Sequence, residues 1–145
     1  MNEASPKPEH MVRLADEMAR YGNDREAPAR AVMGMLGDRW TTLILLVLWQ
    51  VEIRHAELKR AMEALSYEGA ISQRVLTLKL RALERDGFVQ RTVSDDVPPK
   101  VSYRLTELGQ ELSERARTMI DWINTRSGTI RENRERYDSE SSMDG

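Results

Sequence analysis

A length of 145 residues suits one domain, and 40% hydrophobic with 32% charged residues describe a soluble, helix-rich, folded chain. There is no cysteine, which excludes disulfides, thiolate metal sites and a redox thiol. The most apolar run, residues 43–49, is far shorter than the roughly 18 residues of a membrane helix, and no signal peptide is visible. We therefore expect a cytoplasmic protein with no membrane partner.

The net charge of −2 conceals an uneven distribution along the chain. Residues 1–52 carry 6 basic and 8 acidic side chains, residues 53–105 carry 10 and 7, and residues 106–145 carry 6 and 9. Positive charge is thus concentrated in the middle of the chain. Because phosphate affinity is a local property, a mildly acidic protein can still bind DNA through such a segment.

The first quarter of the chain predicts an arm helix and a second short helix. Residues 1–8 hold two prolines and no periodicity, which predicts a disordered start. In residues 9–26, Met11, Leu14 and Met18 recur at helical spacing and predict an arm that ends near Gly22. Proline at position 28 is typical of the first turn of a helix, which we expect to end at residue 37.

A third helix begins after Asp38 and is apolar on almost every side. A helix that is hydrophobic all round is usually buried all round, so we expect this one at the centre of the domain. Trp40 and Trp49 are interpreted as core residues. The alternative is that Met33, Leu36, Trp40 and Trp49 line a pocket for a small-molecule effector.

Residues 56–65 predict the next helix, with Leu58, Met62 and Leu65 on its inner side, and residues 66–70 predict a turn. Ser72 is a good N-cap for the helix that follows, because its hydroxyl can accept from a free backbone N–H. In that helix three leucines recur at i, i+4 and i+7 and predict a buried stripe: Leu76, Leu80 and Leu83.

The opposite side of this helix carries the candidate DNA contacts. Arginine suits the two acceptors of guanine, glutamine suits adenine, and a threonine methyl can touch the methyl of thymine. With the N-cap, the candidates are Ser72, Gln73, Arg74, Thr77, Leu78 and Arg81. Arginines on a helix can also be an ordinary solvated surface, and the order of the elements has to decide between the two interpretations.

Residues 88–93 and 101–105 alternate and are rich in strand formers, which predicts a β-hairpin around SDDVPPK. A helix-turn-helix followed by a hairpin is typical of a winged helix, whose hairpin reaches the flanking phosphates or the minor groove. Arg91 and Lys100 are the candidate contacts in the wing, whereas Asp95 and Asp96 would repel phosphate.

Thr106 caps a long last helix, assigned to residues 106–137, before a disordered tail at residues 138–145. Its apolar stripe is longer than one small domain needs, so we expect it to meet a second copy of the chain. Together with the arm, the candidate dimerisation residues are Met11, Leu14, Met18, Leu108, Leu112, Met119 and Ile123. Residues 9–137 then form a single domain, with residues 27–105 as its DNA-binding core.

Four sequence blocks follow one another in a recognisable order: APARAVMGMLGDRWTTLILLVL, RHAELKRA, ISQRVLTLKLRALERDGFVQR and VPPKVSYRLTELG. Over residues 27–122 they resemble the HxlR-type family of bacterial transcription regulators, relatives of the MarR-like winged-helix proteins. The resemblance implies a mainly α fold with a small β-hairpin wing. It also implies a winged helix-turn-helix whose N- and C-terminal helices form a homodimer on operator DNA.

The chain departs from this family in two places. Many members carry a cysteine where this chain has Ala27, so sensing through a thiol is not expected here. The chain also has several extra residues around MEALSYEG. They predict either an additional turn on the first helix of the helix-turn-helix or a bulged loop.

The sequence therefore predicts a sequence-specific, homodimeric transcriptional regulator, of the repressor type, that binds a pseudo-palindromic double-stranded operator. The alternative is a winged-helix module that binds proteins and not DNA. No nucleophile motif or phosphate loop is visible, and the two histidines, His10 and His55, show no metal-ligand spacing. We therefore predict no enzymatic activity, no metal and no cofactor.

Overall fold

The computed structural model describes residues 7–67 and 69–144, which fall into two compact units. The first unit runs to Arg39 and the second begins at Trp40. The single domain expected over residues 9–137, with a core at residues 27–105, stays a prediction. Neither helix of the first unit buries any of its residues.

The first unit consists of α1 (Glu9–Tyr21) and α2 (Pro28–Gly37). The first helix ends at Gly22, whose φ of +92° favours glycine. Proline opens α2, as predicted, directly after the buried Ala27. Residues 1–6 of the predicted disordered start lie outside the described residues.

The second unit is built around α3 (Arg39–Val47), α4 (His55–Leu65) and α5 (Gln73–Arg85). Its core includes the predicted Trp40 and the three leucines of α5, together with Ile44, Leu45, Leu48, Leu58 and Met62. Two core predictions are wrong: Trp49 is 44% exposed and Leu65 is 65% exposed. Trp49 lies beyond the end of α3. Leu65 is the last residue of α4, so it extends past the core that buries Leu58 and Met62 on the same side of the helix.

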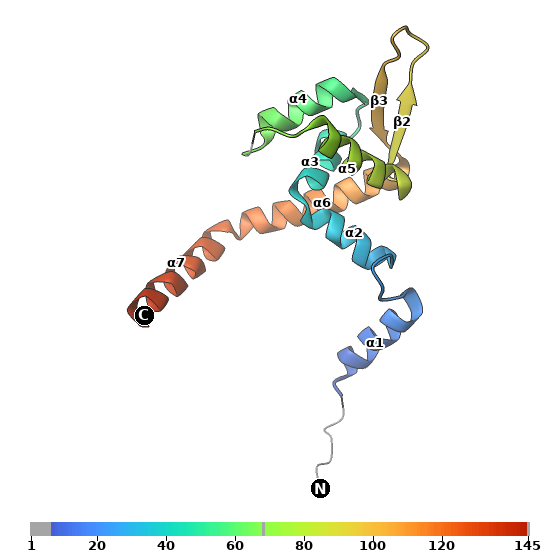
Figure 1. Ribbon diagram of the computed structural model, residues 1–145. Helices are drawn as coiled ribbons and strands as arrows, with labels where there is room; N and C mark the ends of the chain where they lie inside the picture. Colours follow the sequence, from blue (N-terminus) through green and yellow to red (C-terminus); the bar gives the residue numbers. More distant parts are fainter. Residues whose placement is uncertain (1–6, 68, 145) are drawn as a thin grey trace. The chain divides into compact units, whose positions relative to one another are not determined.

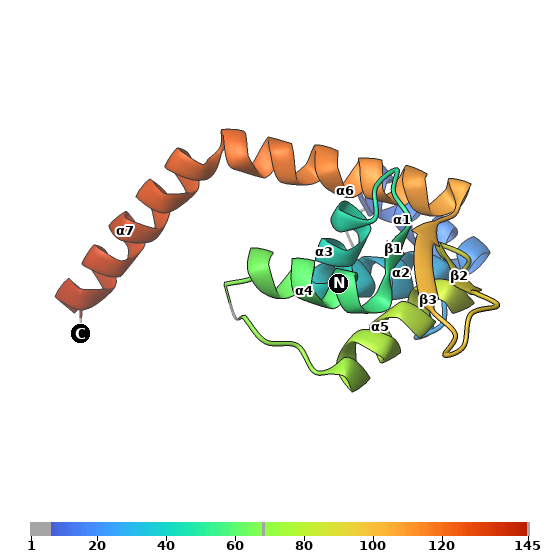
Figure 2. The same cartoon turned by 90° about the horizontal axis from the view of Figure 1, so that it is seen from above.

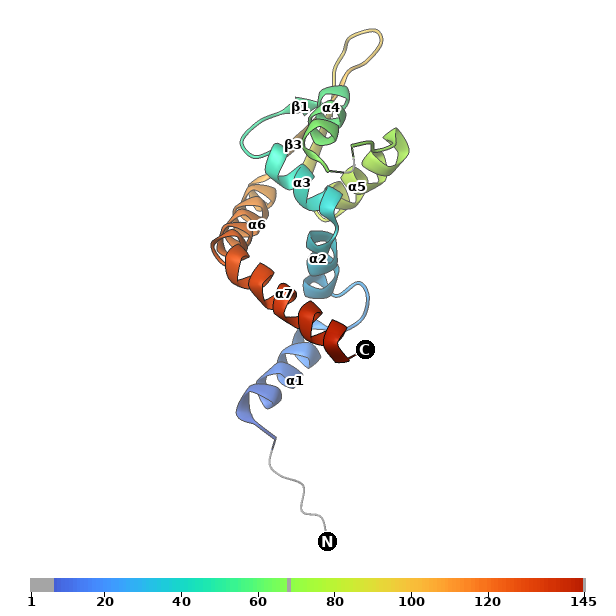
Figure 3. The ribbon, with the colours of Figure 1, turned by 90° about the vertical axis from the view of Figure 1, so that its left-hand side faces the viewer.

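The sheet has three antiparallel strands in the order β1-β3-β2. The predicted hairpin is present as β2 (Val89–Val93) and β3 (Val101–Leu105), and the loop between them projects away from the helices (Figures 1 and 3). A short strand that the sequence did not predict, β1 (Ile53–Arg54), pairs Ile53 with Tyr103 and Arg54 with Ser102. The start of α4 is thereby fixed beside the wing.

The extra residues predicted around MEALSYEG fall at the end of α4 and in the loop that leads to α5. Residues 62–65 of that stretch belong to α4, which ends at Leu65, and the loop begins at Ser66, so both predicted alternatives stay open. Glu63 Oε2 accepts a hydrogen bond from the Ile71 N–H at 3.2 Å, and Ile71 is buried. Gly69 takes a φ of +75°. The end of the loop is therefore held to α4 just before α5 begins.

The C-terminal segment differs from its prediction in two ways. The single helix expected over residues 106–137 is two helices, α6 (Glu107–Thr125) and α7 (Ser127–Asp144), with a bend between them (Figure 2). The tail expected to be disordered from residue 138 is helical to Asp144, and residue 145 lies outside the described part. Opposite charges at i, i+4, such as Arg131 with Glu135, favour helix in this polar segment.

No helix in the described ranges is long and apolar enough to cross a membrane.

Candidate nucleic-acid interface

The two long sides of α5 have opposite environments. Leu76, Leu80 and Leu83 are fully buried, as predicted, and the Ser72 hydroxyl accepts from the Val75 N–H at 3.1 Å. The predicted DNA-contacting side is open to solvent: Thr77 is half-buried, and the exposed members are Gln73, Arg74, Leu78 and Arg81. Packing therefore anchors one side of the helix and leaves the other free to meet a ligand.

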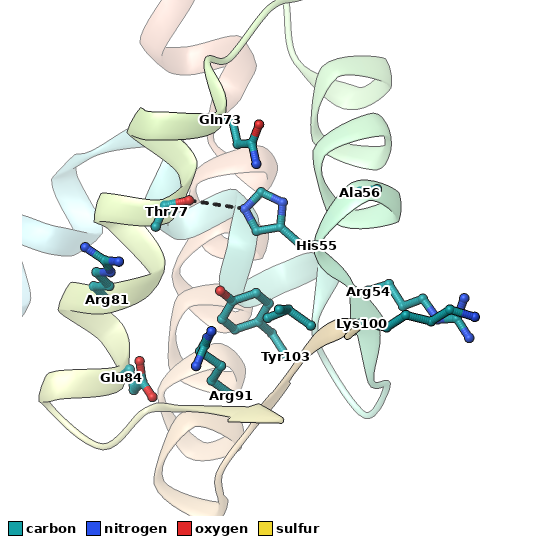
Figure 4. Close-up of a pocket in the computed structure, with 11 residues that line it drawn as sticks. Arg54, His55, Ala56, Gln73, Thr77, Arg81, Glu84, Arg91, Lys100 and Tyr103 are labelled. Atoms are coloured by element: carbon teal, nitrogen blue, oxygen red, sulfur yellow. Dashed lines mark hydrogen bonds between the residues drawn. The ribbon is translucent and has the colours of Figure 1, made fainter. Parts of the chain in front are cut away.

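A groove of about 640 Å³ runs between α5, the start of α4 and the wing (Figure 4). Five of the eight predicted DNA contacts line it, namely Gln73, Thr77, Arg81, Arg91 and Lys100. The other three, Ser72, Arg74 and Leu78, are exposed on α5 but do not line the groove. We call this space the α5–wing groove.

Six further residues of the groove were not among the predicted contacts, including Arg54, His55 and Tyr103. The first two come from β1 and the first residue of α4, and Tyr103 lies opposite Ile53 in the sheet. Nothing in the local sequence indicates this pairing, because a two-residue strand has no alternation to detect. The RH dipeptide before a predicted helix was the one available signal of cationic side chains at this position.

The charges of the α5–wing groove are mostly positive. Four cations line it, Arg54, Arg81, Arg91 and Lys100, against the single carboxylate of Glu84. The acidic residues at the hairpin tip, Asp95 and Asp96, are exposed and are not part of the lining. Such an excess of positive charge on a concave surface attracts phosphate oxygens.

His55 connects three elements at the base of this groove. Its Nε2 lies 3.3 Å from Thr77 Oγ1 on α5, and its ring centroid lies 6.0 Å from that of Tyr103 on β3, with the planes tilted by 52°. Burial lowers the pKa of the His55 imidazole from its ordinary value, and the nearby Lys59 ammonium lowers the pKa further. Both effects favour the neutral form of the imidazole.

A second cavity, of about 540 Å³, lies between the end of α3 and α6. Its lining includes Trp49 and Leu46 on one side and Ser113 and Arg117 on the other. The buried Ser113 hydroxyl donates to the Leu45 carbonyl at 2.7 Å, which holds the two helices together at this point.

The four predicted effector-pocket residues are divided between the two units. Met33 and Leu36 belong to the first unit, and Trp40 and Trp49 to the second. Only Trp49 lines the cavity between α3 and α6. Within residues 7–67 and 69–144, no cluster of three or more His, Cys, Asp or Glu side chains is placed to hold a metal ion.

The helices α4 and α5 are joined by a loop and followed by a hairpin wing, and a cationic groove lies beside them. This arrangement defines the winged helix-turn-helix class of DNA-binding proteins. The chain belongs to the HxlR-like helix-turn-helix family, whose sequence model matches residues 35–130. It is therefore a transcriptional regulator of the helix-turn-helix type, as the sequence analysis predicted.

Individual relatives agree with this assignment. The chain is 38% identical over 98 residues to the uncharacterized HTH-type transcriptional regulator YtfH of Escherichia coli (strain K12). This match covers 68% of this chain and 73% of YtfH. The ytfH regulator from Salmonella typhimurium superimposes with a TM-score of 0.64 at 35% identity, over 77% of this chain and 95% of that one.

The reduced form of YodB from B. subtilis, also a transcriptional regulator, superimposes with a TM-score of 0.56 at 33% identity. That match covers 67% of this chain and 90% of YodB.

Proposed function

We propose that the protein is a homodimeric repressor that binds a pseudo-palindromic operator through α5 and the wing. The α5–wing groove is the observation that carries this proposal, since it places four cations beside the exposed side of α5. Phosphate contacts to Arg91, Lys100 and Arg54 would position the duplex, and α5 would read the base edges. We place the protein in the cytoplasm, where a bacterial operator would be found.

Within α5 we assign base reading to the exposed polar residues. Arg74 and Arg81 suit guanine, Gln73 suits adenine, and the Thr77 methyl and Leu78 suit a thymine methyl. Ser72 holds the first turn of the helix, which is the part of a recognition helix that usually meets the bases.

The proposal of a dimer rests on two apolar stripes that a single chain leaves uncovered. In α1, Met11, Leu14 and Met18 are about half-exposed, and so are Leu108, Met119 and Ile123 in α6, while Leu112 is half-buried. Exposed apolar side chains that recur along one side of a helix favour association. A two-fold dimer would present two α5 helices to half-sites about 34–36 Å apart, one turn of DNA.

We infer that any effector acts reversibly and without a covalent bond. The structures of YodB include a diamide-treated form, and those of the redox regulator HypR include reduced and oxidised forms. This chain has no cysteine, so it has no thiolate for an oxidant or electrophile to attack. The cavity lined by Trp49 and Leu46 is the place in the described structure where we expect an apolar effector to bind.

The DNA-binding proposal is tested by an electrophoretic shift on the DNA upstream of the protein's own gene and on a random duplex of equal length. Arg74→Ala should weaken binding to the preferred duplex by about 1–3 kcal/mol and relax base preference. Lys100→Ala should weaken both duplexes alike and flatten the salt dependence by roughly one unit of slope.

The matched control is Arg131→Ala, which removes an exposed arginine from α7 and should leave both affinities unchanged. If wild-type protein binds neither duplex, or if Arg74→Ala binds both as the wild type does, α5 is not the recognition helix.

The effector proposal is tested by adding diamide to the protein–DNA complex at doses that leave methionine intact. Continued binding is the expected result, whereas release of the DNA would show that a covalent signal acts without a thiol.

A further inference from the structure

His55 occupies a position in the α5–wing groove that the DNA-binding roles above do not use. It opens α4, its Nε2 is engaged by Thr77 on α5, and its ring faces Tyr103 on the wing (Figure 4). Its second ring nitrogen, Nδ1, has no hydrogen-bond partner in the described part of the chain. The side chain is half-buried, so it is both held in place and open to the groove.

We propose that His55 is a phosphate-binding residue that makes its contact only when protonated, so that binding of DNA takes up one proton. This inference rests on the proposed function, because it names a pH-dependent contact in the same groove. Its ligand is a phosphate group of the duplex backbone, which has the same chemistry at every sequence.

The hydrogen-bonding capacity of imidazole explains the dependence on protonation. A neutral ring has one N–H donor and one acceptor nitrogen, whereas an imidazolium donates from both. In the tautomer whose Nε2–H donates to the Thr77 hydroxyl, protonation adds an Nδ1–H that can donate to a phosphate oxygen. In either tautomer protonation adds a positive charge, which strengthens a hydrogen bond from the ring to phosphate.

The charged groups around His55 determine whether binding of DNA favours or disfavours protonation of its imidazole. They come from every element of the groove: Arg54 from β1, Lys59 from α4, Arg81 and Glu84 from α5, Arg91 from β2, and Lys100 with Tyr103 from the β3 side. Cations are in excess, so protonation is disfavoured while the groove is empty. In agreement with this, burial and then Lys59 lower the pKa of His55 in the free protein.

A phosphate in the groove reverses this balance. Its negative charge offsets the surrounding cations and pairs with the imidazolium, so the pKa of His55 is higher in the complex than in the free protein. Because the coupling between proton and DNA is reciprocal, affinity for DNA must rise as pH falls between those two pKa values and level off outside them. Each unit of difference in pKa corresponds to about a tenfold change in the dissociation constant.

The composition of the chain makes this inference easy to test. His10 and His55 are its two histidines, and they are the side chains whose ordinary pKa lies between pH 5.5 and 8. His10 lies in α1, outside the unit that holds the groove. His10→Gln is therefore a matched control for His55→Gln.

The first measurement is fluorescence anisotropy with a labelled random-sequence duplex and with a duplex from upstream of the protein's own gene, from pH 5.5 to 8 at constant, low ionic strength. Wild type and His10→Gln should bind both duplexes several-fold to about tenfold more tightly at the acidic end. His55→Gln should show little dependence on pH.

The variant Thr77→Val separates a phosphate contact from a purely structural role of His55. It removes the hydroxyl that holds Nε2 but keeps the imidazole, so its affinity should fall while its pH dependence remains. If His55 serves only to position α5, His55→Gln will weaken binding equally at every pH, and that result would overturn the proposal.

The second measurement is NMR titration of the two imidazole Cε1–H signals in the free protein and in the complex. The pKa of His55 should rise on DNA binding. A pH-independent affinity of the wild type, or an unchanged His55 pKa in a formed complex, contradicts the inference and leaves the DNA-binding function intact. An absence of DNA binding at every pH contradicts the function itself.

Discussion

Two helices of equal length, α1 and α5, use the same sequence pattern with opposite results. Each has 13 residues and an apolar stripe at helical spacing. In α5 the stripe is fully buried at Leu76, Leu80 and Leu83, whereas in α1 it is about half-exposed at Leu14 and Met18. The N-terminal caps differ as well, since Ser72 caps α5 with its side chain and Pro8 before α1 makes no such bond.

This difference shows that an apolar stripe predicts that its side chains will be buried, but not which part of the protein or which partner buries them. For α5 the cover comes from within its own unit, where the helix packs in a core with residues such as Ile44 and Leu58. In the described chain no residue of α1 is buried. Such a helix gains most of its stability from a packing partner, so α1 should depend on association and α5 should not.

The largest expected effect comes from removing a covered leucine. Leu80→Ala should lower the free energy of unfolding by about 2–5 kcal/mol, because it deletes a fully buried side chain and leaves a cavity. Urea unfolding followed by circular dichroism measures the loss. Leu14→Ala, measured at protein concentrations low enough to keep the chain monomeric, should cost far less. Equal losses in the two variants would remove the contrast between the helices.

A smaller effect is expected where α6 approaches the end of α5. A Cβ on Gly109 would collide with the Phe88 carbonyl, and Phe88 follows directly on the turn that ends α5. Gly109→Ala should therefore lower the free energy of unfolding by about 1–3 kcal/mol. In the control, Gly128→Ala on α7, the added Cβ meets no other atom, so a gain of about 0.5–1 kcal/mol is expected from helix propensity. Similar changes in both variants would mean that the close approach is absent.

The third prediction concerns burial of the apolar stripe of α1 in the proposed dimer. Replacing Leu14 and Met18 by alanine should raise the dissociation constant of the proposed dimer, because each half-exposed side chain loses about 1 kcal/mol of burial per protomer. Sedimentation equilibrium over a range of concentrations measures this change. Leu78→Ala on α5 is the control, since Leu78 is 51% exposed but lies on the side assigned to DNA. Its association should match that of the wild type.

The smallest effect is expected at the cap of α5. Ser72→Ala removes the acceptor of the Val75 N–H and should cost about 1 kcal/mol of stability, whereas Ser72→Asp keeps an acceptor and should cost little. Thermal unfolding of the three proteins side by side distinguishes them. No change on Ser72→Ala would mean that the cap contributes nothing to the difference between α5 and α1.

Much of the second unit could be predicted from the sequence because its signals are local. The Ser72 cap and the spacing of the leucines gave α5, and the alternation of residues 101–105 gave β3 with Tyr103 and Leu105 inside. These features depend on neighbours within one turn of helix or along one strand. The eight candidate contacts followed from them, and five of these line one groove.

The parts that could not be predicted depend on contacts between distant segments or on the end of an element. Strand β1 exists because Ile53 lies opposite Tyr103, fifty residues away, and this pairing is what brings Arg54 and His55 into the groove. Trp49 was expected in the core because the apolar run continues through it, but the helix ends two residues earlier at Val47. The helical residues 138–144 were missed because composition alone does not separate a charged helix from a disordered tail.

The first turn of α6 is fastened to the place where α5 ends and β2 begins. The Thr106 N–H donates to the Phe88 carbonyl at 3.0 Å, its hydroxyl donates to the Gly87 carbonyl, and Gly109 leaves no space between the helix and that backbone. The helix with the proposed dimer stripe is therefore joined directly to the elements that we propose face DNA. In the proposed dimer, a rotation where the two α6 helices meet would therefore be passed on to the two α5 helices. A molecule that binds only at the proposed dimer interface could then determine which spacing of half-sites the dimer binds.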